Sequence, residues 1–407
     1  MAPFSACFPL LMKKNSFLRL GLALLMVSLL VESTFAQPRR KGGRGGGRFV
    51  QMEQRALAEG FKGVTTDGKV QSGLFEIKST GVSTAPVVNA AKAFLEGLSD
   101  AQALKTMFPV NDDEWRKWAN QHSYPRQGMG FDKMTPKQRE LAFGLVGAGL
   151  SAKGLKLTQD IMKLNGTLGE LTGRHEEYTE WLYWITIMGE PSTTQPWGWQ
   201  LDGHHVVINY FVLGDQVVMT PLFVGSEPVA ATSGKFKGTI IMQAEQAKGL
   251  EMINALDGKL QAKAIVRREK PGNNGSLEAF KDNVLIPYAG LKASEMNSSQ
   301  RELLMELVGL YVGNTRADQA RVRMSEVARH LDDTYFAWVG GTSSDSVYFF
   351  RIHSPVIIIE FDHQRGIALN RGGPPNRDHI HSVVRTPNGN DYGKELLRLH
   401  LEKEHSK

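Results

Sequence analysis

The sequence predicts an α+β fold, in which a helix-rich N-terminal half and a helical middle pack on an antiparallel β-sheet. Apolar residues recur at helical spacing between residues 85 and 170, and aromatic and β-branched runs typical of strands follow. A second β-rich region begins near residue 335, after further helices. Two strand regions separated by helices most simply form one sheet that buries a face against those helices.

Helix-start signals support this division of the chain. Thr135-Pro136-Lys137-Gln138 combines a capping residue with proline in the first turn, and Ser99 begins another helical segment. Asn111 is expected to cap a short helix that carries Trp115 and Trp118. The predicted helices are residues 51–60, 85–98, 99–108, 136–150, 151–168, 244–260, 299–312, 317–331 and 394–403.

Turn residues separate the strand candidates. The predicted strands are residues 181–188, 197–211, 217–220, 335–339, 347–353, 356–362 and 378–385, with a loop at 364–377 before the last one. Leu213-Gly214-Asp215-Gln216 is expected to be a hairpin turn. If Ser354-Pro355 closes a second tight hairpin, Phe349 lies opposite Glu360 and Val347 lies opposite Asp362.

The first 36 residues have the features of a signal peptide. Lys13, Lys14 and Arg19 precede an apolar run, and Ala36 is the small residue expected at a cleavage site. The apolar run is too short to span a bilayer comfortably, although an uncleaved membrane anchor is the alternative, and Met12 is an alternative start. We therefore expect an exported protein, periplasmic or extracellular, with no membrane span after cleavage.

The rest of the chain divides by composition. Residues 37–48 are rich in glycine and arginine and are expected to form a disordered linker. Residues 49–84 form a poorly defined N-terminal segment. Residues 85–407 are expected to form a single α+β domain, and its oligomeric state is left open.

Charge and cysteine content exclude several classes of protein. The formal net charge of +6 contains +2 from residues 1–36 and +5 from residues 37–48, which leaves −1 for residues 49–407. Because the excess of basic over acidic residues lies outside the predicted fold, a nucleic-acid-binding protein is not expected. The only cysteine, Cys7, lies in the predicted signal peptide, so the mature chain can form no disulfide, cysteine zinc site or iron–sulfur cluster.

Two pairs of histidines are the strongest functional signal. His379 and His381 lie two apart in a predicted strand, so both side chains point to one face, and two neutral imidazoles there can bind one metal ion. His204 and His205 are adjacent in a predicted strand, so only one of them should reach the site unless Gly203 introduces a bulge. The alternative for each histidine is a hydrogen-bonded structural role.

Carboxylates and arginines accompany the histidine strand. Glu360 and Asp362 share one strand face, where a carboxylate is paired, metal-bound or at a rim, because burying it alone is costly. Glu360 is the candidate carboxylate ligand, and Glu360, Asp362 and Arg385 are the candidate catalytic residues. Arg385 can hold a substrate carboxylate or phosphate. The alternative is a salt bridge between these carboxylates and Arg385, Arg351 or His353.

Trp197 and Trp199 are candidates for binding a ligand through their rings. Two tryptophans can form an aromatic platform for a ring or a sugar face, and core packing is the alternative. Other motifs fail. The stretch His175-Glu176-Glu177-Tyr178-Thr179 lacks the second histidine of a helical zinc-protease motif, and no Gly-x-Ser-x-Gly nucleophile elbow occurs.

Several dispersed motifs resemble those of a known family. They are Trp-Gly-Trp-x-x-x-Gly-His-His at 197–205, Pro-Leu-Phe-x-Gly at 221–225, Phe-Ala-Trp-x-Gly at 336–340, Glu-Phe-Asp at 360–362, His-Ile-His-x-Val-x-Arg at 379–385 and Asn-Asp-Tyr-Gly at 390–393. Together they resemble the bacterial domain of unknown function 3500, from about residue 85 to the end. The resemblance implies an exported single-domain protein and no established reaction. The loop 364–376 departs from the familiar pattern and looks inserted.

The leading functional hypothesis is a metal-dependent enzyme. Two or three histidines with Glu360 would suit Zn²⁺, Fe²⁺, Mn²⁺ or Cu²⁺, and an open coordination position would permit hydrolysis by a bound water. A hydrolytic reaction on a small anionic or sugar-like molecule is preferred to oxidation. The alternatives are a non-catalytic exported ligand-binding protein and a structural envelope protein.

Overall fold

The computed structural model describes residues 46–405, which lie in one compact unit, Arg39–Lys407. The predicted signal peptide, residues 1–36, and the predicted linker up to residue 45 lie outside the described residues. The last residues of that predicted linker, 46–48, belong to a helix.

The helices occupy the regions that the sequence periodicity indicates. They are α2 (Gly46–Ala58), α3 (Ala85–Glu96), α4 (Asp100–Thr106), α5 (Pro136–Gly149), α6 (Ala152–Thr172), α7 (Gln243–Asn254), α8 (Gly258–Ala264), α9 (Ser298–Val312), α10 (Ala317–Arg329) and α11 (Lys394–His405). Thr135 and Ser99 form capping boxes with Gln138 and Gln102. Such an N-cap contributes about 1 kcal/mol, because it satisfies amide groups that the first helical turn leaves without partners.

The strands form a single sheet, which confirms the predicted α+β class. They are β1 (Met107–Phe108), β2 (Met129–Gly130), β3 (Tyr183–Met188), β4 (Trp197–Gly203), β5 (Val206–Leu213), β6 (Gln216–Val218), β7 (Leu222–Ser226), β8 (Ile265–Arg267), β9 (Leu291–Lys292), β10 (Tyr335–Gly340), β11 (Tyr348–His353), β12 (Ile358–Arg365) and β13 (Pro375–Arg385). The main order is β1-β3-β4-β5-β7-β13-β12-β11-β10-β8, and only the β1–β3 and β8–β10 pairs are parallel.

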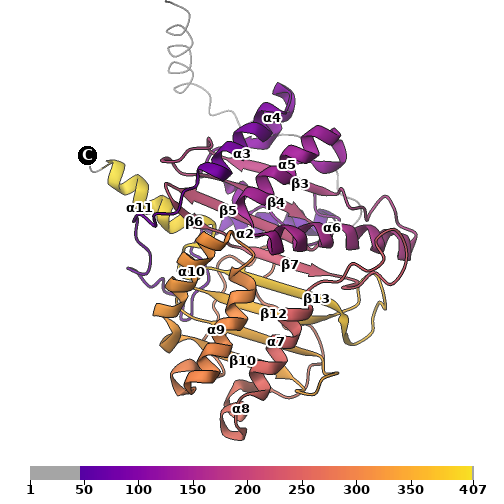
Figure 1. The fold of residues 1–407 in the computed structure, drawn as a ribbon, viewed down its shortest axis with the longest axis vertical. Coiled ribbons are helices and arrows are strands. Elements are labelled where there is room, and N and C mark those ends of the chain that lie inside the picture. The colour runs from indigo at the N-terminus through magenta and orange to yellow at the C-terminus, as the bar shows by residue number, and fades with distance from the viewer. Residues whose placement is uncertain (1–45, 406–407) are drawn as a thin grey trace, which may run out of the picture. The chain divides into compact units, whose positions relative to one another are not determined.

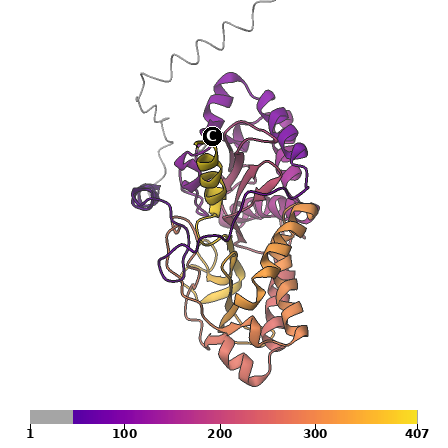
Figure 2. The same ribbon diagram turned by 90° about the vertical axis from the view of Figure 1, so that its left-hand side faces the viewer.

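The two faces of the sheet are covered differently. Helices α3, α5, α6, α7, α9 and α10 lie over one face (Figure 1), where they bury the apolar side chains of alternate strand residues. The other face is covered by α2, α11 and long connecting segments (Figure 2), with a separate apolar core around Trp115, Phe211 and Tyr392. None of the helices in the described part of the chain is long and apolar enough to cross a lipid bilayer.

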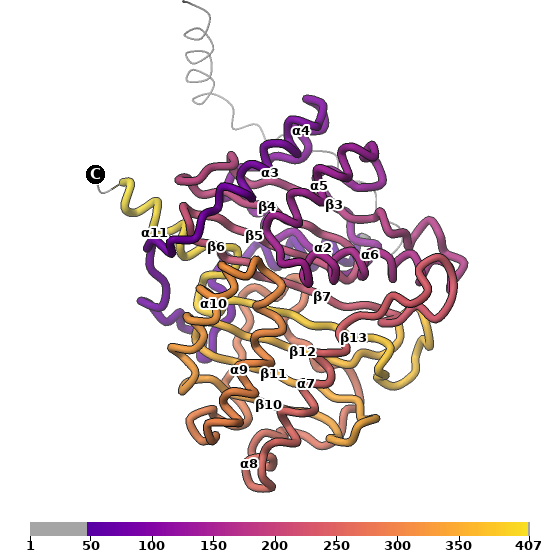
Figure 3. Tube along the Cα trace, in the orientation of Figure 1, coloured from indigo at the N-terminus to yellow at the C-terminus, as the bar shows by residue number. Residues whose placement is uncertain are grey.

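Strand β7 joins the two β-rich regions. It pairs with β5 on one side and with β13 on the other, both antiparallel (Figure 3). The β5 and β13 strands are therefore two strand spacings apart, although about 170 residues of sequence lie between them. This arrangement brings the two histidine motifs to the same end of the sheet.

Three local predictions were wrong. Trp115 lies in a single 3₁₀ turn, Asp113–Arg116, which is capped by Asp112 rather than by Asn111, and Trp118 follows it outside any helix. The predicted helix 244–260 is divided at Asp257, which caps α8. The loop 364–377 is shorter, because β12 runs to Arg365 and β13 begins at Pro375.

The register of the β11–β12 hairpin also differs from the prediction. The Ser354 amide donates to the Ile357 carbonyl, so the turn is longer than Ser354-Pro355 alone. Arg351 therefore lies opposite Glu360, and Phe349 lies opposite Asp362. The difference is two residues, which preserves the face to which each side chain points.

Candidate functional site

His379 and His381 lie on β13, on the face covered by connecting segments. In the β12–β13 pair His381 lies opposite Asp362, and in the β13–β7 pair it lies opposite Gly225. The odd-numbered residues of β13 and the even-numbered residues of β12 share this face, as strand alternation requires. Both histidines are buried, with exposed fractions of 2% for His379 and 8% for His381.

His204 and His205 form the two-residue turn between β4 and β5, and they are not strand residues as predicted. His205 has a φ of +66°, a left-handed conformation that costs a residue with a side chain about 1–2 kcal/mol. The two rings stack with centroids 3.9 Å apart instead of pointing to opposite faces. The ring centroid of His205 lies 5.4 Å from that of His379 and 5.2 Å from that of His381.

Gly225 makes the approach of these side chains possible. It lies on β7, between the His205 turn and β13, and its amide donates to the His205 carbonyl over 2.8 Å. A Cβ atom at this position would lie 2.4 Å from the Ile380 carbonyl oxygen and 3.1 Å from the His381 ring. Because Gly225 has no side chain, β13 and the His381 ring can lie close to the backbone of β7.

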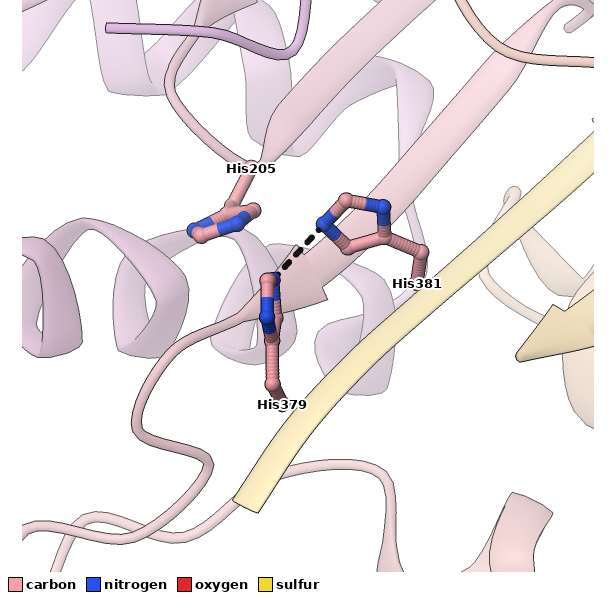
Figure 4. A group of neighbouring side chains, drawn as sticks. All are labelled: His205, His379 and His381. Atoms are coloured by element: carbon pink, nitrogen blue, oxygen red, sulfur yellow. Dashed lines mark hydrogen bonds between the residues drawn. The ribbon is translucent and has the colours of Figure 1, made fainter. Parts of the chain in front are cut away.

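His205, His379 and His381 form one cluster, the histidine cluster (Figure 4). One nitrogen from each ring lies within 4.8 Å of the corresponding nitrogens of the other two. His204 lies behind the cluster, with its Nδ1 2.7 Å from the Asn165 side-chain oxygen. The structure thus brings three of the four predicted histidines together and gives the fourth a hydrogen bond elsewhere.

The Nδ1 atoms of the two strand histidines are engaged by acceptors. His379 Nδ1 lies 2.6 Å from the Arg365 carbonyl oxygen, and His381 Nδ1 lies 2.7 Å from Glu278 Oε1. A carbonyl or carboxylate oxygen can only accept, so each Nδ1 carries the ring proton. In the neutral rings both Nε2 atoms therefore present lone pairs, and these two atoms face each other 3.0 Å apart.

Burial disfavours the protonated forms of His204, His205 and His379. Burial, together with the neighbouring His381, lowers the pKa of His379 to about 3. Burial also holds the pKa values of His204 and His205 well below their usual range. Although burial opposes it, the interaction with His381 lowers the pKa of Glu278, so this carboxylate is ionised at neutral pH.

The geometry fits a single metal ion. Two ligands of a tetrahedral ion, each about 2.1 Å from it, stand roughly 3.4 Å apart. The 3.0 Å separation of the two Nε2 atoms is close to this value, and a ring nitrogen of His205 completes a set of three nitrogens within 4.8 Å of one another. Hydrogen bonds from the second nitrogen of a ligating histidine to a carboxylate or carbonyl are typical of metal sites.

The histidine cluster opens into a cavity of about 330 Å³. Its other polar lining residues include Glu227, Glu278 and Asn120, whose amide donates to Glu278 Oε2 over 3.2 Å. Glu227 accepts the backbone amides of residues 367–369, which ties the loop after β12 to the cavity wall. Burial raises the pKa of Glu227, although these three amides oppose that effect.

Glu360 and Asp362 lie outside the histidine cluster and bind a connecting segment. Glu360 is paired with Arg351 and accepts the backbone amides of Ser276 and Leu277. Asp362 is paired with Lys270 at 2.6 Å and accepts the amides of residues 274 and 275. Both carboxylates therefore hold residues 270–277 against the sheet, which is the salt-bridge alternative rather than metal ligation.

Arg385 has no room for a substrate. Its side chain is fully buried and pairs with Asp282 at 3.0 Å and Asp391 at 3.1 Å. Its other N–H groups donate to the carbonyls of Leu277 and Glu278. The predicted substrate-binding arginine thus positions the segment that carries Glu278.

Trp197 and Trp199 are core residues and form no ligand platform. Both have an exposed fraction of 0% and belong to the core on the helical side of the sheet. Trp199 stacks on Tyr210 with ring centroids 5.1 Å apart, and the Trp197 indole donates to the Ser192 carbonyl. A hairpin tryptophan that packs in this way cannot contact a ligand.

Sequence reasoning missed the residues that complete the site. Glu278, Asn120 and Glu227 come from irregular segments without hydrophobic periodicity, so no pattern marked them. The only signal was Glu227-Pro228, which follows the Pro-Leu-Phe-x-Gly motif after one intervening residue, Ser226.

The fold and the site define an α+β protein with a buried histidine cluster capable of holding a metal ion. A family model described as Protein of unknown function (DUF3500) matches residues 80–394, so the chain belongs to this family. No curated protein and no solved structure matches the chain.

Proposed function

We propose that this protein is a metal-dependent enzyme of the hydrolase type, with one divalent ion held by His205, His379 and His381. The observation that carries the proposal is the 3.0 Å approach of two Nε2 lone pairs whose rings are each oriented through Nδ1 by an acceptor. A cation between them removes the repulsion between these lone pairs. Three histidines with one open position are a ligand set of catalytic zinc sites, which favours Zn²⁺ over Fe²⁺, Mn²⁺ or Cu²⁺.

The residues of the chain have distinct roles in this proposal. Glu278 and the Arg365 carbonyl orient two ligand rings and raise their basicity. The cavity gives a small molecule access to the fourth coordination position, and its volume of about 330 Å³ is at the lower end of the range for ligand sites. A metal ion at this position supplies Lewis acidity and a bound water that ionises near neutral pH.

Metal titration tests the binding step. Protein purified without a histidine tag and stripped with a chelator should take up one Zn²⁺ per chain, and the His379→Ala/His381→Ala variant should take up none. At a free ion concentration 100 times the Kd, binding stabilises the fold by about 2.7 kcal/mol, which urea unfolding detects. The control is His363→Gln, because His363 is equally buried but lies across the sheet, bonded to Gln246 and the Tyr348 amide.

Turnover tests the catalytic step. Zinc-dependent release of p-nitrophenol from p-nitrophenyl acetate or p-nitrophenyl phosphate, lost in the double histidine variant and kept in His363→Gln, supports a hydrolase. Stoichiometric zinc without any turnover supports instead a ligand-binding protein, the second candidate. Absence of bound metal, with equal stability in the presence and absence of zinc, overturns both the metal site and the enzyme.

Export is part of the proposal, on the strength of the predicted signal peptide. N-terminal sequencing of the mature protein should begin after Ala36. A mature protein that starts at Met1 or Met12 contradicts it.

A further inference from the structure

A second chamber lies next to the histidine cavity. It has a volume of about 470 Å³ and shares three lining residues, His122, Tyr178 and Ile367, with the cavity. The two spaces are therefore adjacent, and we call the second one the outer chamber. A ligand that extends beyond the histidine cavity would enter it.

The outer chamber is positively charged. Arg174, Arg365 and Arg371 line it, and none of its lining residues within 46–405 is acidic. The histidine cavity, in contrast, is lined by Glu227 and Glu278. The ligand end that occupies the outer chamber therefore meets a different electrostatic environment from the end at the histidines.

Within residues 46–405, two of the three guanidinium groups have no carboxylate partner. Arg174 is paired with Glu177. The Arg365 side chain donates to the Pro271 carbonyl, which is neutral. Among the described residues, Arg371 has no ion-pair or hydrogen-bond partner. Guanidinium groups without a counter-charge are available for bidentate bonds to a phosphate or carboxylate.

These arginines are tethered to the histidine cluster through the backbone. The Arg365 carbonyl accepts from His379 Nδ1, and residues 367–369 are held by Glu227. The segment from Arg365 to Arg371 is thus anchored at two points. One is His379, a candidate metal ligand, and the other is Glu227 in the wall of the histidine cavity. A group bound by these arginines is held next to the histidine cavity.

We propose that the outer chamber binds an anionic group, phosphate or carboxylate, of a small ligand whose uncharged part extends past Tyr178 into the histidine cavity. This inference specifies the substrate class of the proposed enzyme. It rests on the proposed function only in placing the uncharged part of the ligand at the histidine cluster. It assigns to Arg365 and Arg371 the role that the sequence had suggested for Arg385.

Binding to metal-free protein tests the inference without using the metal site. Titration calorimetry of phenyl phosphate, benzoate and benzyl alcohol should show binding of one or both anions and none of the neutral alcohol. The Arg365→Ala/Arg371→Ala variant should bind the anions at least tenfold more weakly. Arg321→Ala, an exposed arginine on α10, should bind them as the wild type does.

The relative affinities identify the anion. Tighter binding of phenyl phosphate indicates a phosphate, and tighter binding of benzoate indicates a carboxylate. Equal affinities of the wild type and the double arginine variant, binding of benzyl alcohol as tight as that of the anions, or no binding at all overturns the inference. Zinc titration of the same variant separates the two proposals, because the arginine substitutions should leave zinc uptake unchanged.

Discussion

Two groups of buried polar side chains lie on the same face of β13, and they differ in how their charges are balanced. Arg385 is surrounded by Asp282, Asp391 and two carbonyls, so its charge is compensated and its N–H groups are bonded. At the other end of the strand His379 and His381 bring two lone pairs together with no donor between them in the described chain. Both clusters bury polar groups. In the described chain the N–H groups of Arg385 are bonded, whereas the facing lone pairs of His379 and His381 have no donor.

The cluster around Arg385 positions the segment that carries Glu278, which contacts the histidine cluster. Arg385 holds the carbonyls of Leu277 and Glu278, and Glu360 holds the amides just before them. The Glu278 side chain is then directed to His381. The difference indicates that the charged residues of this face serve mainly to position a segment, whereas the histidines are available for binding.

The largest expected effect on stability comes from removing the charge of Arg385. Arg385→Met leaves Asp391 buried without a cation and leaves Asp282 with Arg116 alone, so urea unfolding should show a loss of about 3–5 kcal/mol. Arg398→Met is the control, because Arg398 forms its ion pairs on the exposed side of α11 and should cost less than about 1 kcal/mol. Equal effects of the two substitutions would show that Arg385 is not structural.

A smaller effect is expected at a buried histidine that belongs to neither cluster. His353 has no hydrogen-bond partner on either ring nitrogen within the described chain and packs against Tyr288, with ring centroids 4.6 Å apart and the rings tilted by 51°. Burial, with the nearby Arg351, lowers its pKa from 6.5 to about 3. The unfolded chain therefore takes up a proton that the folded chain does not, and the wild type loses stability as the pH falls from 6.5 towards 3.

His353→Phe removes this pH dependence. At pH 5 the protonation of the unfolded ring costs the wild type about 2 kcal/mol, so the variant should gain that much relative to the wild type between pH 7 and pH 5. Urea unfolding at the two pH values measures the difference. A variant whose stability changes with pH as the wild type does would contradict the low pKa.

The smallest effect tests the link between the clusters. Glu278→Gln removes the charge behind His381 and should weaken zinc binding at least tenfold, about 1.4 kcal/mol. Glu360→Gln is the matched comparison: it weakens the pair with Arg351 and should lower stability while leaving zinc affinity unchanged. If Glu360→Gln weakens zinc binding more than Glu278→Gln does, Glu360 is the carboxylate that serves the metal.

The sequence predicted the elements and the histidine signal but not the contacts between them. Strand alternation placed His379, His381 and Arg385 on one face, and the capping residue Thr135 marked the start of α5. The conformation of the His204–His205 turn was missed because aromatic and β-branched residues on both sides resemble one continuous strand. The pairing of β7 between β5 and β13 depends on long-range contacts that no local pattern encodes.

The roles of the charged residues could not be read from the sequence for a similar reason. A carboxylate next to a histidine strand has the same local pattern whether it binds a metal or a backbone amide. The backbone groups that Glu360 and Arg385 bind lie in residues 276–278, an irregular segment 83 to 108 residues away in the chain. Only the path of that segment across the sheet decides between the two roles.

The most direct test of the metal site is X-ray absorption spectroscopy of the protein loaded with one equivalent of Zn²⁺. Three imidazole nitrogens are expected at about 2.0–2.1 Å from the zinc, together with at least one further light ligand. The imidazole signal should disappear in the His379→Ala/His381→Ala variant. A zinc environment of oxygen ligands alone, or one unchanged in that variant, would contradict the central claim that His205, His379 and His381 hold the metal.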